Sequence, residues 1–350
     1  TDLLHMPMVQ DMLDRTVTTL HGRLDLPDLV PFYRAFPNSC LVSISDHQRL
    51  PMPPVNWGGT IYPVVPGHEI VGRVIETGPD VPRHQVGDIV AVGCMVDSCQ
   101  QCDQCDHGEE QYCRNGRTDS YNSPDRIDGE LTRGGYAKYL VSREEFVLKM
   151  PEGLDVAKAA PLLCAGITTY SPLKEWGIGP GSKVAVIGLG GLGHMAVKLA
   201  AAMGAEVTVL STSDRKKADA ERMGARHFLT NSDKAAMKAA AESVDLIINT
   251  VSATHEVASH IQLLARDGTM VMLGLTTEGL PVYAVPLLWR RRRIAGSLIG
   301  GIKETQEMLD FCAEHGITCD IETIAPAQIN EAYERMLKSD VRYRFVIDMA

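Results

Sequence analysis

The stretch that decides the fold is Lys183-Val184-Ala185-Val186-Ile187-Gly188-Leu189-Gly190-Gly191-Leu192-Gly193. Its first five residues predict a buried strand, and the glycines that follow match the pattern G-x-G-x-x-G. Residues 194–203 predict the helix that this pattern requires next. Gly188 makes the tight turn, Gly190 lets the backbone approach a pyrophosphate, and Gly193 permits close helix–strand packing. The free N–H groups of the helix N-terminus favour phosphates. A dinucleotide site is therefore predicted, the alternative being a glycine turn without a cofactor.

The end of the next predicted strand should select between NAD and NADP. An acidic residue about 20 positions beyond the glycines would bind the ribose 2′-hydroxyl and repel a 2′-phosphate. Here the chain reads Ser211, Thr212, Ser213, Asp214, Arg215, Lys216. Hydroxyl donors beside a guanidinium suit a dianionic phosphate, so the sequence favours NADP(H). The alternative is that Arg215 to Lys217 only begin a solvated helix.

Strands and helices alternate from this motif onward. Residues 183–187, 206–210, 245–249 and 269–273 predict buried strands with alanine-rich helices between them, which indicates a doubly wound parallel sheet. Residues 70–149 have all-β texture, with strands expected at 70–75 and 88–92. A helix at about 303–315 and a strand at 343–348 follow the sheet. We expect a dinucleotide domain over 154–294 and a β-rich substrate domain over 1–153 and 295–350.

Composition sets the broad class. The 350 residues are 45% hydrophobic and 22% charged, and the net charge of −10 argues against nucleic-acid binding as the main function. No apolar run is long enough for a spanning helix, and residues 1–5 do not resemble the start of a signal peptide. The basic run Arg290 to Arg293 is interpreted as a solvated helix or strand edge. We expect a cytoplasmic protein.

Four of the nine cysteines fall within fifteen residues, as Cys99-x2-Cys102-x2-Cys105-x7-Cys113. Four thiolates at this spacing can close a tetrahedral shell around one Zn²⁺ and leave no open position, so the predicted site is structural. Metal binding there would contribute folding free energy. An iron–sulfur cluster usually has a proline after its last cysteine, whereas Arg114 follows here. A redox-active thiol cluster or a coincidental spacing would also place four cysteines this close together.

His68 and Glu69 stand together at the head of a predicted strand, and Cys164 follows Pro161-Leu162-Leu163. Taken alone, such a histidine is more often a core residue, and such a cysteine a small buried hydrophobe. Their surroundings change that interpretation. The relevant motifs are Gly67-His68-Glu69-x2-Gly72, the four-cysteine lobe, Tyr121-Asn122-Ser123-Pro124, Gly134-Gly135-Tyr136, Cys164 to Tyr170, Gly188 to Gly193, Gly296-Ser297-x-Ile299-Gly300-Gly301 and Glu304 to Met308.

On these motifs, the chain from Trp57 onward resembles the zinc-containing medium-chain alcohol dehydrogenases. It is most similar to their cinnamyl alcohol dehydrogenase branch and to the bacterial NADPH-dependent aldehyde reductases. The resemblance implies a GroES-like β-rich domain joined to a Rossmann domain, NADPH-dependent reduction of aldehydes and a homodimer with a contact near residues 283–297.

The resemblance also implies a second, catalytic zinc, held by one cysteine together with His68 and Cys164, with Glu69 beside it. An open fourth position would let zinc act as a Lewis acid on a carbonyl. Trp57 would line the substrate pocket and Thr168 would lie near the nicotinamide. The further cofactor contacts that it implies are Thr250, Val251, Gly274, Ser297 and Ile299.

The missing element is that first cysteine. The family has Gly-x-Cys-His-Ser/Thr-Asp about eleven residues before the tryptophan, with a histidine two places beyond the aspartate. Aligning Asp46 with that aspartate puts Ser43 at the ligand position, Ile44 at the histidine and Ser45 at the proton-relay hydroxyl, with His47 one residue early. Serine is a poor zinc ligand, and Cys40 could replace it only in a rearranged loop.

The mismatch extends over residues 1 to about 55, which have scattered prolines and little period-2 alternation. Two interpretations are open: a divergent segment, or a stretch altered at the gene level, for example by a compensated frameshift or a sequence error. Resequencing the gene and measuring the intact mass would separate them.

Three functions follow from these patterns. The first is zinc-assisted reduction of aldehydes by NADPH, with oxidation of primary alcohols in reverse. The second is a zinc-independent NADPH reductase of activated C=C or C=N bonds that keeps only the structural zinc. The third is a non-catalytic NADPH-binding relative. Metal content and turnover of aldehydes distinguish them.

Overall fold

The computed structural model describes residues 17–20, 40–43, 57–60, 65–276 and 278–349. The chain forms two compact units, residues 1–65 and 66–350. In the first unit, β1 (Val17–Leu20), β2 (Cys40–Ser43) and β3 (Trp57–Thr60) form a parallel sheet in that order. The weak alternation of the sequence therefore did not exclude strands. Valine and threonine favour extended backbone even in segments of four residues.

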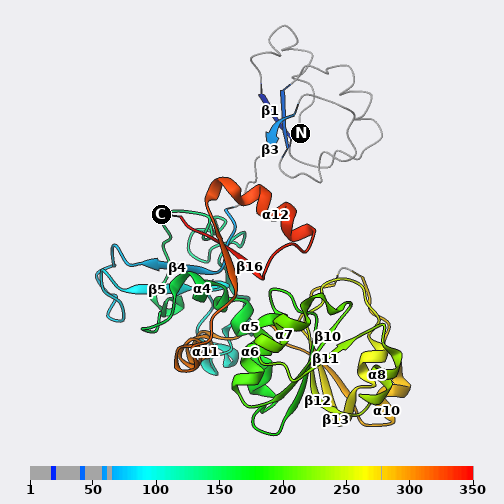
Figure 1. Cartoon of the computed structure of the whole chain (residues 1–350). Coiled ribbons are helices and arrows are strands. Elements are labelled where there is room, and N and C mark those ends of the chain that lie inside the picture. The colour runs from blue at the N-terminus through cyan, green and yellow to red at the C-terminus, as the bar shows by residue number, and fades with distance from the viewer. Residues whose placement is uncertain (1–16, 21–39, 44–56, 61–64, 277, 350) are drawn as a thin grey trace. The chain divides into compact units, whose positions relative to one another are not determined.

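A six-stranded parallel sheet dominates the second unit, in the order β11-β10-β9-β12-β13-β14. Its strands are β9 (Lys183–Ile187), β10 (Glu206–Ser211), β11 (His227–Thr230), β12 (Val244–Asn249), β13 (Leu264–Met272) and β14 (Arg293–Gly296). Helices cover both of its faces (Figure 1). The predicted doubly wound sheet is confirmed. Two edge strands were not predicted, because β11 and β14 are only partly buried and lack a long apolar run.

The alternation of side chains in β9 shows why the central strands are apolar throughout. Val184 and Val186 enter one hydrophobic cluster, while Ala185 and Ile187 enter another on the opposite face. All four side chains are buried. Burying a valine or isoleucine side chain contributes about 1.5 to 3 kcal/mol, so a strand covered on both faces is stabilised by every residue.

The helices that surround this sheet are α5 (Ala165–Glu175), α6 (Gly193–Ala202), α7 (Lys217–Arg222), α8 (Lys234–Ala239), α9 (Ala258–Ile261) and α10 (Ala284–Leu288). The observed α6 begins within one residue of the helix expected after the glycines. Among the described residues, no helix combines the length and apolar character that crossing a membrane requires.

The rest of the second unit is built from short elements. An antiparallel sheet joins β4 (Ile70–Arg73), β5 (Ile89–Val92) and β8 (Leu148–Lys149), and β6 (Met95–Asp97) pairs with β7 (Thr118–Asp119). The short helices nearby are α3 (Asp103–Asp106), η3 (Glu110–Tyr112), η4 (Glu144–Phe146), α4 (Val156–Ala159) and η5 (Ala160–Leu163). The strands expected at 70–75 and 88–92 therefore form, slightly shorter than predicted.

The chain after the large sheet runs through α11 (Ile302–His315), β15 (Ile321–Ile324), η7 (Pro326–Gln328), α12 (Ile329–Leu337) and β16 (Arg344–Ile347). β15 and β16 pair in parallel. The Gln306 side chain of α11 donates to the Lys149 carbonyl oxygen and accepts from the Lys149 N–H, at 3.0 and 2.9 Å. This segment therefore packs against the antiparallel sheet of β4, β5 and β8.

The basic run 290–293 corrects one sequence interpretation. Arg290 and Arg291 are solvated and pair with Glu242 and Asp267. Arg292, however, is only 9% exposed, and its guanidinium donates to the carbonyl oxygens of Leu264, Pro286 and Gln262. A buried guanidinium requires such partners, and here it joins the ends of three segments. The interpretation as a solvated edge was wrong for Arg292.

Candidate active site and metal centres

The glycine loop lies between β9 and α6, as the sequence predicts. Gly188 has a φ of +86°, which favours glycine. A Cβ on Gly193 would lie 1.8 Å from the Gly188 carbonyl oxygen, so no side chain fits at that position. No side chain caps the N-terminus of α6, so its positive dipole end stays open to an anion, although the His194 and Met195 N–H groups donate to the Gly190 and Leu192 carbonyl oxygens at 3.0 Å. The loop therefore has the geometry of a pyrophosphate site.

Three further residues predicted to contact the cofactor lie beside this loop. The Thr250 hydroxyl donates to the Ile187 carbonyl oxygen at 2.9 Å, and the Val251 N–H to the Asn249 Oδ1 at 3.2 Å. A Cβ on Gly274 would lie 2.1 Å from the Val251 carbonyl oxygen. These residues follow β12 and β13, so they share one edge of the sheet with the glycine loop.

The segment after β10 brings the predicted 2′-phosphate residues together. The Arg215 Nε donates to the Ser213 Oγ at 3.4 Å, and the Ser213 N–H to the Ser211 Oγ at 3.5 Å. Lys216, in η6 (Asp214–Lys216), turns back and donates from Nζ to the Leu189 carbonyl oxygen at 2.6 Å. Two hydroxyls, a guanidinium and an ammonium thus gather next to the glycine loop, while Thr212 is exposed.

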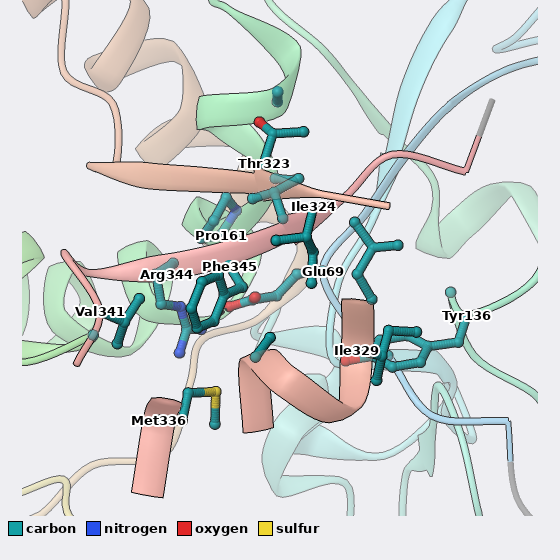
Figure 2. A pocket seen from close by; sticks show the side chains of 18 of the residues that line it. Glu69, Tyr136, Pro161, Thr323, Ile324, Ile329, Met336, Val341, Arg344 and Phe345 are labelled. Atoms are coloured by element: carbon teal, nitrogen blue, oxygen red, sulfur yellow. Dashed lines mark hydrogen bonds and ion pairs between the residues drawn. The ribbon is translucent and has the colours of Figure 1, made fainter. Parts of the chain in front are cut away.

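A cavity of about 900 Å³ lies between the glycine loop and the His68 segment. Gly190, Gly191 and Lys216 line it together with His68 and Glu69. Its other lining residues come mainly from the 323–349 segment, and ten lining side chains are labelled in Figure 2. Thr168, Ser297 and Ile299 do not line it. Thr168 and Ile299 are instead buried, and the Ser297 N–H donates to the Met272 carbonyl oxygen at 3.5 Å.

An ion pair between Glu69 and Arg344 crosses this cavity. The guanidinium donates to the Glu69 carboxylate, and the two side chains point toward one another in Figure 2. Burial raises the pKa of the Glu69 carboxyl, and the charge of Arg344 opposes that rise. A Cβ on Gly191 would lie 2.9 Å from Cδ of Arg344, so the arginine also lies against the nucleotide loop. The sequence did not single out Arg344, because its partner is 275 positions away.

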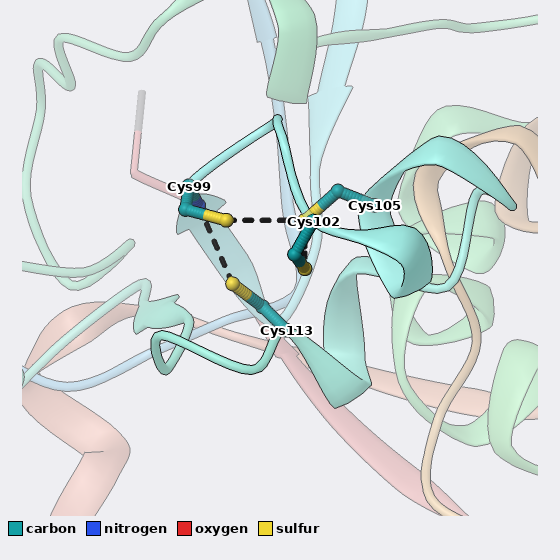
Figure 3. Close-up of side chains that lie close together, drawn as sticks. All are labelled: Cys99, Cys102, Cys105 and Cys113. Atoms are coloured by element: carbon teal, nitrogen blue, oxygen red, sulfur yellow. Dashed lines mark hydrogen bonds between the residues drawn. The ribbon is translucent and has the colours of Figure 1, made fainter.

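The four lobe cysteines converge as predicted (Figure 3). All four Sγ atoms lie within 4.8 Å of one another, with 3.9 Å between Cys99 and Cys105 and 3.6 Å between Cys102 and Cys105. A tetrahedral shell with Zn–S bonds of about 2.3 Å places its sulfurs about 3.8 Å apart. A backbone hydrogen bond from Gln101 lowers the pKa of the Cys99 thiol to about 6. The donor set therefore fits one zinc ion with no open position.

The lobe also holds the start of α11. The Glu110 Oε2 accepts from the Ile302 N–H at 3.0 Å, and the Tyr112 hydroxyl accepts from the Leu298 N–H at 3.3 Å. A Cβ on Gly301 would lie 1.7 Å from the Gly108 carbonyl oxygen. The lobe and the segment 298–302 are thus in direct backbone contact, and the position of one depends on the other.

His68, Cys164 and one cysteine that the sequence reasoning missed form the second cluster. The ligand atoms of His68, Cys94 and Cys164 all lie within 4.8 Å of one another. Hydrogen bonding by Cys94 and then by His68 lowers the pKa of the Cys164 thiol well below its usual value, and the bond to Cys164 raises that of Cys94. Cys94 lies two residues after the end of β5, and its place just beyond the strand predicted at 88–92 was the signal that could have identified it.

The remaining predicted site residues belong to the first unit. Cys40 and Ser43 are the first and last residues of β2, and Trp57 begins β3. Ser45, Asp46 and His47 lie outside the described residues. Within the described part of the chain, the histidine and cysteine ligands that come together are therefore those of the second unit.

Known proteins share both halves of this arrangement. The family described as "Alcohol dehydrogenase GroES-like domain" matches residues 42–152, and the family described as "Zinc-binding dehydrogenase" matches residues 191–314. The NADP-dependent alcohol dehydrogenase C 1 of Mycolicibacterium smegmatis is 54% identical over 336 residues, which are 96% of this chain and 94% of that protein. The aldehyde reductase YahK of Escherichia coli is 53% identical over 294 residues, 83% of this chain and 84% of that protein.

Among solved structures, a cinnamyl alcohol dehydrogenase of Sorghum bicolor superposes with a TM-score of 0.79 at 46% identity, covering 83% of each chain. The first family match begins at residue 42, upstream of Trp57, where the resemblance noted from the sequence begins. The glycine loop, the cysteine lobe and the His68 cluster thus occur in a chain that belongs to the zinc-binding alcohol dehydrogenases with a GroES-like domain.

Proposed function

We propose that this chain is an oxidoreductase that uses NADPH to reduce aldehydes to primary alcohols and that oxidises primary alcohols with NADP in reverse. The observation that carries the proposal is the shared cavity: Gly190, Gly191 and Lys216 line it together with His68 and Glu69. A nicotinamide cofactor on the glycine loop and a carbonyl beside His68 would therefore lie next to one another in this cavity. Hydride transfer requires that proximity.

Different side chains would bind the cofactor, hold the zinc ion and transfer the proton. The N-terminus of α6 would bind the pyrophosphate, and Ser211, Ser213 and Arg215 the 2′-phosphate. Lys216 holds the loop through the Leu189 carbonyl oxygen. When bound, NADPH supplies the hydride, and a zinc ion at His68 and Cys164 supplies Lewis-acid polarisation of the carbonyl. From the first unit, we assign Ser45 to the proton relay, with Asp46 and His47 beside it, and Trp57 to the substrate pocket, on the family resemblance.

Arg344 would act at two points of this site. It neutralises the buried Glu69 carboxylate and lies against Gly191. A cation at that position lowers the cost of burying Glu69 and also favours the phosphates of the cofactor. We therefore infer that Arg344 positions the nucleotide relative to the His68 cluster.

The test combines elemental analysis with an NADPH-oxidation assay on a panel of aromatic and aliphatic aldehydes. We expect two zinc ions per chain and turnover that is lost when the more labile zinc is chelated. One zinc per chain with retained turnover of activated C=C or C=N substrates would instead identify the zinc-independent reductase. Tight binding of NADPH without turnover of any aldehyde would identify a non-catalytic relative.

We further propose that the chain forms a homodimer through the surface between residues 275 and 289, which overlaps the contact that the resemblance implies near residues 283–297. We also propose that the protein acts in the cytoplasm, where thiolate ligands stay reduced. Large apolar side chains are exposed on this surface: Leu275, Val282, Tyr283, Val285, Leu288 and Trp289. Leu288 and Trp289 are 75% and 76% exposed. A monomer rarely exposes such a concentration of apolar groups, and buried tryptophans often dominate binding energy at interfaces.

Trp289→Asp is therefore expected to convert the dimer into monomers, because an unpaired carboxylate would be buried at the interface. Light scattering coupled to size-exclusion chromatography measures the mass. Tyr139→Asp, at an aromatic residue that is equally exposed on another part of the molecule, is the matched control and should remain dimeric. A dimer that persists in Trp289→Asp would rule out this surface.

A further inference from the structure

The His68 cluster contains one more cysteine than the family pattern alone predicts for this chain. The family pattern places its first zinc-ligating cysteine where this chain has Ser43. A serine hydroxyl in that place would leave one thiolate and one imidazole in the ligand set. The described structure nevertheless places two thiols and one imidazole together: Cys94, Cys164 and His68. Two cysteines and one histidine with an open fourth position are the ligand set known for catalytic zinc in alcohol dehydrogenases.

Backbone packing brings the two cysteines together. A Cβ on Gly93 would lie 3.2 Å from the Leu163 carbonyl oxygen, so the end of β5 approaches η5 closely because residue 93 is glycine. The Cys94 Sγ lies 3.6 Å from the same carbonyl oxygen. The Ser120 N–H donates to the Cys94 carbonyl oxygen at 3.0 Å and fixes the backbone on the other side. The cysteine is therefore held from two directions beside Cys164.

The histidine is held independently. Its ring stacks on Tyr121 with 5.8 Å between the ring centroids and an interplanar angle of 15°. Gly67, just before it, has a φ of +103°, and a Cβ there would lie 2.8 Å from Cδ1 of Tyr136. The three ligand atoms thus come from three separate segments, around residues 68, 94 and 164. Each segment is positioned by its own contacts.

We propose that Cys94 is the second thiolate ligand of the catalytic zinc, in place of the cysteine that Ser43 replaces. The proposal concerns the zinc of the proposed aldehyde reductase and rests on that function for its role in turnover, though not for metal binding itself. The zinc site is then built entirely within residues 66–350, and the fourth position remains open for the substrate oxygen.

The test compares Cys94→Ser with Cys40→Ser in the full chain, using zinc per chain and the spectrum of the Co(II)-exchanged protein. The proposal predicts two zinc ions for the unaltered chain and for Cys40→Ser, but one for Cys94→Ser. Loss of a partner that only orients a ligand lowers metal affinity by about 10- to 100-fold, so loss of a ligand should exceed about 100-fold. The near-ultraviolet sulfur-to-cobalt absorption should fall by the contribution of one site in Cys94→Ser and stay unchanged in Cys40→Ser.

Retention of the lobe zinc and of NADPH binding, measured by fluorescence, shows that Cys94→Ser is folded. If that variant is not recovered, Cys94→Asp is measured instead, since a carboxylate is a zinc ligand; its second zinc should bind at least about 10-fold more weakly. Any of four results would overturn the proposal. These are two zinc ions in Cys94→Ser, one zinc ion in the unaltered chain, an unchanged zinc affinity in Cys94→Asp, and loss of the second zinc in Cys40→Ser.

Aldehyde turnover of the unaltered chain, measured in parallel, separates the two proposals. Turnover with a second zinc that does not depend on Cys94 would overturn the ligand assignment and leave the proposed function standing. A second zinc that depends on Cys94, in a protein without aldehyde turnover, would support the ligand assignment and overturn the proposed function.

Discussion

Replacing Cys113 with serine is expected to release one zinc ion per chain and to lower the melting temperature by on the order of 10 °C. The four sulfurs of the lobe converge on one point, and Cys113 is the buried one among them. Structural zinc contributes about 10 to 16 kcal/mol to the folding of small zinc-binding domains, so even partial loss should cost on the order of 5 kcal/mol here. The effect should extend beyond the lobe, because Glu110 and Tyr112 hold the segment at the start of α11.

Elemental analysis and calorimetry measure the two effects. Cys312→Ala is the matched control, because it also removes a buried thiol, but one that contacts Met308 in the core and lies outside the lobe. It should keep its zinc and lose only about 1 kcal/mol of stability. A Cys113→Ser protein with an unchanged zinc content would mean that the lobe does not bind metal through this residue.

The second large effect is expected at the end of β10. Ser211→Asp should reduce kcat/KM for NADPH by roughly 100-fold and raise that for NADH, reversing the cofactor preference. A carboxylate there would accept hydrogen bonds from the ribose hydroxyls of NADH and would repel the 2′-phosphate of NADPH. At an effective dielectric constant of about 20, repulsion between unit charges about 5 Å apart is about 3 kcal/mol.

Steady-state kinetics with both cofactors provides the measurement. Ser142→Asp adds the same charge at a partly exposed position two residues before η4, far along the chain from the nucleotide loop, and should leave the preference unchanged. If Ser211→Asp still prefers NADPH by its original margin, the 2′-phosphate does not bind beside Ser211, and Arg215 would lose its assigned role.

The central sheet could be predicted from the sequence because its strands are buried on both faces. Val184 and Val186 contact one cluster and Ala185 and Ile187 another, so the whole strand is apolar and easily identified. The partly buried edge strand β11 has no such run and was missed. Arg292 was misread for a related reason. Its neighbours Arg290 and Arg291 pair with acidic residues in solvent, and only the fold shows that the third arginine points inward to carbonyl groups.

The candidate site was predictable where its residues are local in sequence. The glycine loop and the cysteine lobe are continuous motifs whose spacing already specifies a turn and a ligand shell. Cys94 and Arg344 were missed because their roles arise from contacts between distant segments: a glycine that admits η5 in one case, and an ion pair with Glu69 in the other. Thr168 is buried and does not line the cavity, and its place near the nicotinamide, which the resemblance implies, stays a prediction.

The ion pair between Glu69 and Arg344 can form only near the end of synthesis, because its two residues are 275 positions apart in the chain. The ribosome delivers Glu69 long before its partner, and every strand of the large sheet emerges between the two. The nucleotide-binding sheet can therefore form on the nascent chain while Glu69 still lacks its counter-charge. Contacts of such long sequence separation form late. A chain that ends before residue 344 would contain the glycine loop but would leave the Glu69 carboxylate without the arginine that neutralises it.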